Sequence, residues 1–154
     1  MLLGIGPIKF PGYLDREEIV VRSAQNRFDV AENDRWAEPL EENFARVLSQ
    51  NLALLLNTDL ITTYPWSPAN RPRYQVEIEV LRFEANSQRN AQLFARWALL
   101  DVGDKKVAIL KESRSMRIAK EKTVAASVAA LSEAVGDLSR EIANAVGATD
   151  GKRK

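Results

Sequence analysis

The sequence contains neither cysteine nor histidine among its 154 residues. Without cysteine no disulfide can form. Without histidine the chain lacks the side chain that most often shuttles protons near neutral pH and the commonest protein ligand of transition metals. Nucleophilic triads that use histidine are therefore excluded, together with ordinary zinc sites. We accordingly expect no catalytic residues, no metal and no cofactor.

Long hydrophobic runs and an excess of charge of one sign are also missing. No segment reaches the roughly 18 consecutive apolar residues that suggest a membrane-spanning helix. Residues 1–10 have no basic start and too short an apolar stretch for a signal peptide. The 22 Lys and Arg nearly balance the 21 Asp and Glu, so no nucleic-acid partner is expected. What is present is the length and the 45% hydrophobic content of one globular domain.

Basic residues are nevertheless concentrated in one segment. Between residues 105 and 122, seven side chains are basic and two are acidic. The basic ones are Lys105, Lys106, Lys111, Arg114, Arg117, Lys120 and Lys122. Two interpretations stay open for this segment. It is either a strand edge that Lys and Arg protect against aggregation, or a weak binding face for an anionic surface.

Apolar spacing predicts strands and one helix in the first half of the chain. Residues 2–10 form a short strand, and residues 19–21 and 27–30 form a hairpin. From residue 39 the apolar side chains recur at steps of three and four, which predicts a helix that ends at Asn57.

Gly4 and Gly6 invite comparison with a dinucleotide-binding loop. That interpretation fails because Lys9 occupies the third glycine position and a turn, not a helix, follows.

The second half predicts an antiparallel meander followed by a long helix. Strict alternation over 74–80 predicts a strand with one buried face, and the phase slips at Val80-Leu81, which indicates a bulge. Strands over 92–101 and 106–118 follow. An apolar stripe over 124–146 then predicts an amphipathic helix packed on the sheet.

Thr123 is the expected N-cap of this last helix, and Gly147 is its expected end. We therefore divide the chain into a single domain over 1–147 and a flexible basic tail over 148–154.

Two groups of residues are candidates for a function. Glu77 and Glu79 project from the same face of one strand, about 7 Å apart, as in a paired-carboxylate hydrolase, or they simply form a solvated strand face. Aromatic residues interrupt the loops and lie close to arginines. They are either lids over the sheet and helix ends or a surface for a protein partner. The candidate partner-binding residues are Tyr13, Leu14, Arg16, Arg35, Trp36, Tyr64 and Trp66.

Several motifs resemble one family when taken together. They are Gly-Pro-Ile-Lys-Phe-Pro-Gly-Tyr-Leu-Asp-Arg over 6–16, Ile-Val-Val-Arg over 19–22, Asp-Arg-Trp-Ala-Glu-Pro-Leu over 34–40 and Tyr-Pro-Trp over 64–66. With residues 74–83 and the final helix, the sequence resembles the ABC-type transport auxiliary lipoprotein family, which includes paraquat-inducible protein C of Gram-negative bacteria. The resemblance covers nearly the whole chain.

The resemblance implies both a fold and a function. The fold would be an α/β domain, a three-layer α/β sandwich with a mixed sheet and two main helices, similar to anticodon-binding domains. The function would be that of a non-enzymatic accessory lipoprotein at the periplasmic face of the outer membrane. It would work with an ABC transporter and its MCE-type partner in moving lipid or other hydrophobic molecules between membranes. A homo-oligomer is compatible with that role, and a carrier that itself binds a small hydrophobic ligand between helix and sheet is the alternative.

Members of that family carry a signal peptide and a lipobox cysteine, and this sequence contains neither. We expect both in the natural precursor, with a soluble variant as the alternative. One acyl chain binds a membrane only marginally, so a lipidated form is expected to need a second contact.

Overall fold

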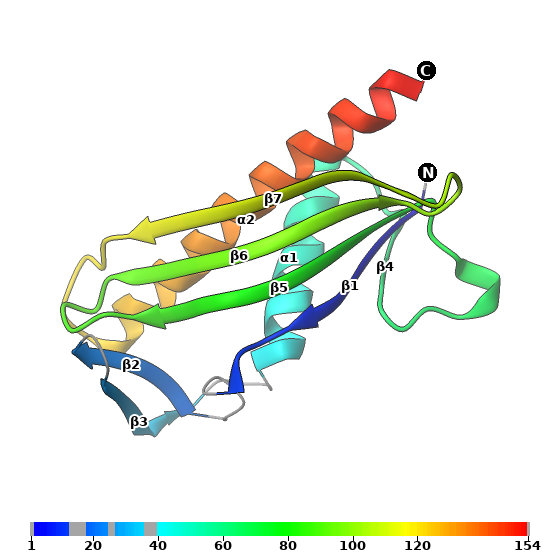
Figure 1. Cartoon of the computed structure of the whole chain (residues 1–154). Helices are drawn as coiled ribbons and strands as arrows, with labels where there is room; N and C mark the ends of the chain where they lie inside the picture. The colour runs from blue at the N-terminus through cyan, green and yellow to red at the C-terminus, as the bar shows by residue number, and fades with distance from the viewer. Residues whose placement is uncertain (1, 13–17, 25–26, 36–39, 154) are drawn as a thin grey trace.

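The computed structural model describes residues 2–12, 18–24, 27–35 and 40–153, with side chains for 2–12 and 42–151. The chain forms a seven-stranded mixed sheet with two long helices (Figure 1). The strands are β1 (Leu3–Lys9), β2 (Glu18–Ala24), β3 (Arg27–Arg35), β4 (Ile61–Thr63), β5 (Tyr74–Ala85), β6 (Ala91–Asp101) and β7 (Lys106–Arg117). The helices are α1 (Leu40–Leu56) and α2 (Val124–Arg153), and a short 3-10 helix, η2 (Pro68–Asn70), lies between β4 and β5. The predicted α/β class with a mixed sheet and two main helices is confirmed.

Strand β1 lies inside the sheet, although it comes first in the sequence. It pairs in parallel with β4 on one side and with β5 on the other. Strands β5, β6 and β7 form the predicted antiparallel meander, and the predicted hairpin is β2 with β3. The register of β5 shifts between Val80 and Arg82, which confirms the bulge predicted from the phase slip at Leu81. Among the described strands, β7 pairs with β6 alone and is therefore outermost.

Both helices lie on the same face of the sheet. They contact each other, with α1 against β1 and β4 and α2 against β5, β6 and β7. Figure 1 shows them behind the sheet, with the front face of the meander uncovered. The described residues thus form two layers, sheet and helices, and the third layer implied by the family resemblance is not found among them. The two helices pack against each other, so the apolar stripes of both α1 and α2 cover the same face of the sheet, and neither helix covers the opposite face.

The core lies between the two layers and follows the predicted periodicities. Alternate residues of β5 and β6 are buried, as are residues of α1 at four-residue steps. Phe44 of α1 packs edge-on against Phe10 and Phe83, each with a ring-centroid distance of 5.4 Å. Helix α1 ends where expected, because Asn57 adopts the left-handed conformation with φ of 51°.

Helix α2 begins as predicted but does not end as predicted. Thr123 Oγ1 accepts a hydrogen bond from the Ala126 N–H at 3.1 Å, which confirms the N-cap. Gly147 is not the end, because it keeps a helical backbone and the helix continues to Arg153. The division of the chain at residue 147 stays a prediction. Within the described part of the chain, neither helix has the length and apolar character that a membrane crossing requires.

Candidate functional site

The structure places two of the seven predicted partner-binding residues in full. Tyr13, Leu14, Arg16 and Trp36 lie outside the described residues, and Arg35 ends β3 with a side chain outside the described part. Tyr64 and Trp66 follow β4, and their rings meet edge-on at a centroid distance of 5.2 Å. Tyr64 is 54% exposed, so it is available to a partner.

The loop that carries these two aromatic residues crosses strand β1 at two glycines. The Tyr64 N–H donates to the Ile5 carbonyl at 2.8 Å, which fixes the crossing point. A Cβ on Gly6 would lie 2.7 Å from the Tyr64 Cβ, and Gly6 has φ of 114°. A Cβ on Gly4 would lie 2.8 Å from the Trp66 ring. The absence of a side chain at both glycines therefore allows the loop to pass this close to β1.

Sequence reasoning had excluded a dinucleotide loop here without finding this role for the glycines. Glycine at alternate positions of one strand face is the signal that could have found it, since glycine in a strand often marks close approach of another segment.

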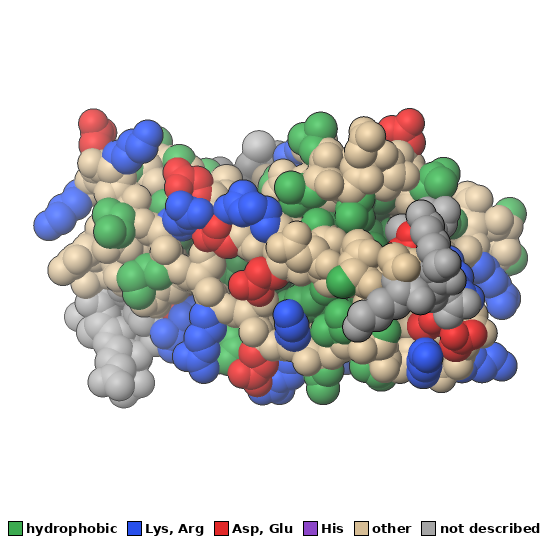
Figure 2. Space-filling view, turned by 90° about the horizontal axis from the view of Figure 1, so that it is seen from above, with side chains coloured by type: hydrophobic (Ala, Val, Ile, Leu, Met, Phe, Trp, Pro, Cys, Tyr) green, Lys and Arg blue, Asp and Glu red, His purple; other side chains and the backbone are tan. Residues whose placement is uncertain are grey.

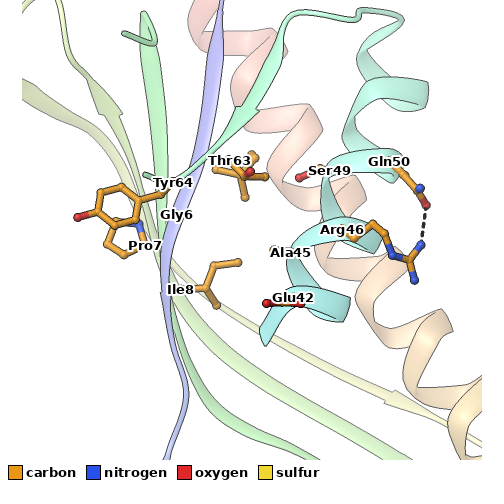
Figure 3. A pocket seen from close by; sticks show the side chains of 11 residues that line it. Gly6, Pro7, Ile8, Glu42, Ala45, Arg46, Ser49, Gln50, Thr63 and Tyr64 are labelled. Carbon is orange, nitrogen blue, oxygen red and sulfur yellow. Dashed lines mark hydrogen bonds between the residues drawn. The ribbon is translucent and has the colours of Figure 1, made fainter. Parts of the chain in front are cut away.

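An open groove of about 640 Å³ lies between β1, β4 and α1. Figure 3 shows Ile8 and Thr63 beside the strands, and Ser49 on α1 facing them across the groove. Tyr64 and Pro7 lie on the far side of β1 and form the rim. The groove exists because β4 pairs only with residues 3–5 of β1, so the edge of β1 beyond Ile5 faces the helix.

The strand wall of the groove carries the apolar Ile5, Pro7 and Ile8, whereas the helix wall carries Glu42, Ala45, Arg46, Ser49 and Gln50. The Ser49 Oγ is buried and has no hydrogen-bond partner among the described residues. On the helix rim, Arg46 donates to Gln50 at 3.4 Å. Apolar walls with a few polar groups are typical of small-molecule sites, whose volumes run from about 300 to 1,000 Å³. The strand wall can therefore contact an apolar part of a ligand, while the helix wall offers polar groups.

The paired carboxylates Glu77 and Glu79 do not form a catalytic site. Both are exposed on the uncovered face of the sheet, and Glu79 lies 3.5 Å from the guanidinium of Arg96. A glycosidase-type acid needs a carboxyl group whose surroundings keep it protonated, usually an apolar pocket. Both glutamates are instead exposed, beside an open hollow that Lys9 and Arg96 also line, so the hydrolase interpretation is wrong and the solvated-face interpretation holds.

A charged cluster joins α2 to β7 on the helix side of the sheet. The Arg117 guanidinium donates to Asp137 at 2.8 Å, and Ser115 and Arg140 also donate to this carboxylate. The hydrogen bond from Arg117, helped by those from Ser115 and Arg140, holds the pKa of Asp137 well below its usual range. A carboxylate held so firmly ionised is a poor proton acceptor, so its role here is structural. No group of acidic side chains suited to a metal ion occurs among the described residues.

Comparisons with known proteins match this chain to one family and to solved structures of similar fold. The family model of the ABC-type transport auxiliary lipoprotein component matches residues 1–143. The fold is similar to the crystal structure of protein XCC0632 from Xanthomonas campestris, with a TM-score of 0.83, 18% identity, and coverage of 99% of this chain and 88% of that chain. An uncharacterized protein gives a TM-score of 0.83 at 19% identity, over 94% and 91% of the two chains.

A more distant likeness is to the PelC dodecamer from Paraburkholderia phytofirmans. Its TM-score is 0.51 at 8% identity, with coverage of 88% of this chain and 83% of that chain. At identities this low, structural similarity shows a shared fold and does not show a shared function. No curated protein matches the sequence of this chain.

Proposed function

Because the chain belongs to the family of ABC-type transport auxiliary lipoprotein components, we propose that it is a non-enzymatic scaffold in a Gram-negative envelope transport system. Its site of action would be the periplasmic face of the outer membrane, where it would bind an MCE-type protein and help to complete a path for lipid or other hydrophobic molecules. The family match over residues 1–143 carries this proposal. Family members of this kind are generally non-enzymatic.

The partner surface is proposed at the loop aromatic residues. Tyr64 supports it, because a half-exposed tyrosine fixed by a neighbouring tryptophan is a rigid, amphipathic contact of the kind enriched at interfaces. Tyr13 and Trp36 complete the proposed surface from the sequence motifs.

Pull-down with a candidate MCE protein tests the partner surface. Tyr64→Ala, Tyr13→Ala and Trp36→Ala should each weaken the complex, whereas Leu54→Ala on the exposed side of α1 should not. The circular dichroism spectrum of each variant should match that of the parent chain. If all three aromatic variants fold and bind as the parent chain does, the surface lies elsewhere.

A homo-oligomer is part of the same proposal. The similar fold in a PelC dodecamer supports it, because a fold of this kind can assemble into a homo-oligomer. Light scattering on the purified chain, alone and with the MCE protein, measures the assembly. A mass equal to the 17.3 kDa of one chain under both conditions would contradict both the homo-oligomer and the complex with the MCE protein.

A second function, transport of a small hydrophobic ligand by the chain itself, is favoured by the groove between β1, β4 and α1. Lipid extraction from the purified protein followed by mass spectrometry tests it. Ala45→Trp would place an indole in the groove and should lower the amount of bound lipid, while Ser132→Trp on the exposed surface of α2 serves as the matched control. An extract without lipid from the parent chain would contradict the carrier function.

A further inference from the structure

The outermost strand, β7, has an open edge that extends over 12 residues. Its register with β6 runs without interruption from Ile109 to Arg117, and the segment contains no proline. Proteins usually shorten, bulge or cover such an edge, because its unpaired N–H and C=O groups can pair with another strand. The edge of β7 is therefore competent to extend the sheet.

Three of the exposed large apolar side chains among the described residues lie on this strand: Val107, Leu110 and Met116. Leu110 is 68% exposed and Met116 is 61% exposed, and both lie on the uncovered face of the sheet. Between them on the same face are Glu112 and Arg114. Seen from above, on the side where β7 is outermost, hydrophobic side chains and charges of both signs are interspersed (Figure 2).

The order of these four side chains is self-complementary about Ser113. On either side of it stand Glu112 and Arg114, and beyond them Leu110 and Met116. If two β7 strands lie antiparallel with Ser113 opposite Ser113, each glutamate faces an arginine and each leucine faces a methionine. We propose that two copies of this chain associate in this way, edge to edge through β7, as a symmetric dimer with one continuous sheet.

Neighbouring registers are less favourable. If the register of the strand pair slips, each side chain stays on its own face of the sheet only when the symmetry axis moves by a whole residue. An axis at residue 112 would place Glu112 directly against Glu112, and an axis at residue 114 would place Arg114 against Arg114. Like charges directly opposite each other destabilise a strand pair. The charge order therefore selects the register centred on Ser113.

The helix side of the edge is mainly polar. Lys111 is exposed on this side of β7, and in the dimer it lies opposite Ser115 of the second copy. Beside Ser115 an open, polar hollow of about 460 Å³ is lined by Asp137 and Glu141, and also by Arg114, Arg117 and Arg140. The charge order on the uncovered face is thus complementary to itself, which favours a second copy over an anionic membrane surface as the occupant.

Cysteine cross-linking tests the register, because the chain has no cysteine of its own. Glu112 and Arg114 of the two copies would be opposite each other, with Cα atoms about 4.5–5.5 Å apart, within the range of a disulfide. Glu112 and its own symmetry mate would be about 8 Å apart, which is too far. A mixture of the Glu112→Cys and Arg114→Cys chains under mild oxidation should therefore give at least tenfold more disulfide dimer than either chain alone. Equal yields in all three samples, or no dimer in the mixture, would overturn the proposal.

Charge reversal gives a second test that does not depend on oxidation. Glu112→Arg and Arg114→Glu should each shift the light-scattering mass toward one chain, while a 1:1 mixture of the two variants, in which every pair is again opposite in charge, should regain the dimer mass. Lys120→Glu, beyond the end of β7, is the matched control and should leave the dimer unchanged. A mixture that stays monomeric while the parent chain is dimeric would place the contact on another surface. A monomeric parent chain at every accessible concentration would overturn the proposal directly.

Discussion

Replacement of Gly6 by alanine should destabilise the domain strongly, even though the change adds only one methyl group. Gly6 has φ of 114°, and its missing Cβ would lie 2.7 Å from the Tyr64 Cβ. A non-glycine residue in a sparsely populated backbone region costs about 1–3 kcal/mol. Forcing an extra methyl into a closely packed position costs about 1–3 kcal/mol more. We therefore expect Gly6→Ala to lower the free energy of unfolding by about 3 kcal/mol, a large part of the roughly 5–15 kcal/mol typical of a domain.

Urea unfolding followed by tryptophan fluorescence measures this change, and thermal unfolding gives a second value. For a chain of this size, 3 kcal/mol corresponds to a fall of about 6–12 °C in Tm. Gly147→Ala is the matched control. Its Cβ would meet nothing within 4 Å, and alanine in a helix is more stable than glycine by about 0.5–1 kcal/mol.

The double variant Gly6→Ala with Tyr64→Gly separates the two causes. Removal of the Tyr64 Cβ relieves the steric contact and leaves the backbone strain, so part of the lost stability should return. For a chain of this size a fall of about 6–12 °C in Tm is expected. If the Tm of Gly6→Ala lies within about 1 °C of the parent value instead, the explanation of the two glycines by the loop that crosses β1 is wrong.

Three further outcomes follow from the contacts described above. Asp137→Asn should lower the free energy of unfolding by about 1–2 kcal/mol at pH 7, the range of a charged hydrogen bond that is partly open to solvent. Arg117 lowers the pKa of Asp137, so this stabilisation is complete above the unfolded pKa of about 3.9 and is lost as the pH falls. In urea titrations, the difference in the free energy of unfolding between Asp137→Asn and the parent chain should therefore narrow below about pH 4. Trp97→Ala should cost about 3–5 kcal/mol, since this side chain is 1% exposed, and a loss under 1 kcal/mol in the same titrations would contradict its place in the core. Glu77→Gln with Glu79→Gln should leave the unfolding midpoint within about 0.5 kcal/mol of the parent, because both side chains are solvated, and a larger loss would show an undetected structural role.

The elements with strong periodicity were predictable from the sequence. The alternation in β5 and the stripe of α2 depend on local spacing, which burial on one face imposes directly. The bulge near Leu81 was also predictable, because a bulge shifts the phase of the alternation. Asn57 could be recognised as a stop because few other residues tolerate its conformation.

Other features depend on contacts between distant segments and could not be predicted in this way. The position of β1 between β4 and β5 requires pairing across more than fifty residues, which no local pattern encodes. The groove beside α1 arises from the shortness of β4, a result of tertiary packing. The end of α2 was misplaced because Gly147 is compatible with both a helical and a left-handed backbone, and the sequence does not distinguish them.

The interior position of β1 also determines how the domain responds to mechanical load. A pull on the N-terminus along the strand direction acts on the hydrogen bonds to β4 and β5 together, in shear, because both neighbours run parallel to β1. Many bonds must then break at once, whereas an outermost strand peeled from its end loses its bonds one at a time. A domain held by its N-terminus would therefore be attached through a strand well placed to resist extraction, and forced unfolding from that end would be governed by the unfolding rate rather than by the equilibrium stability.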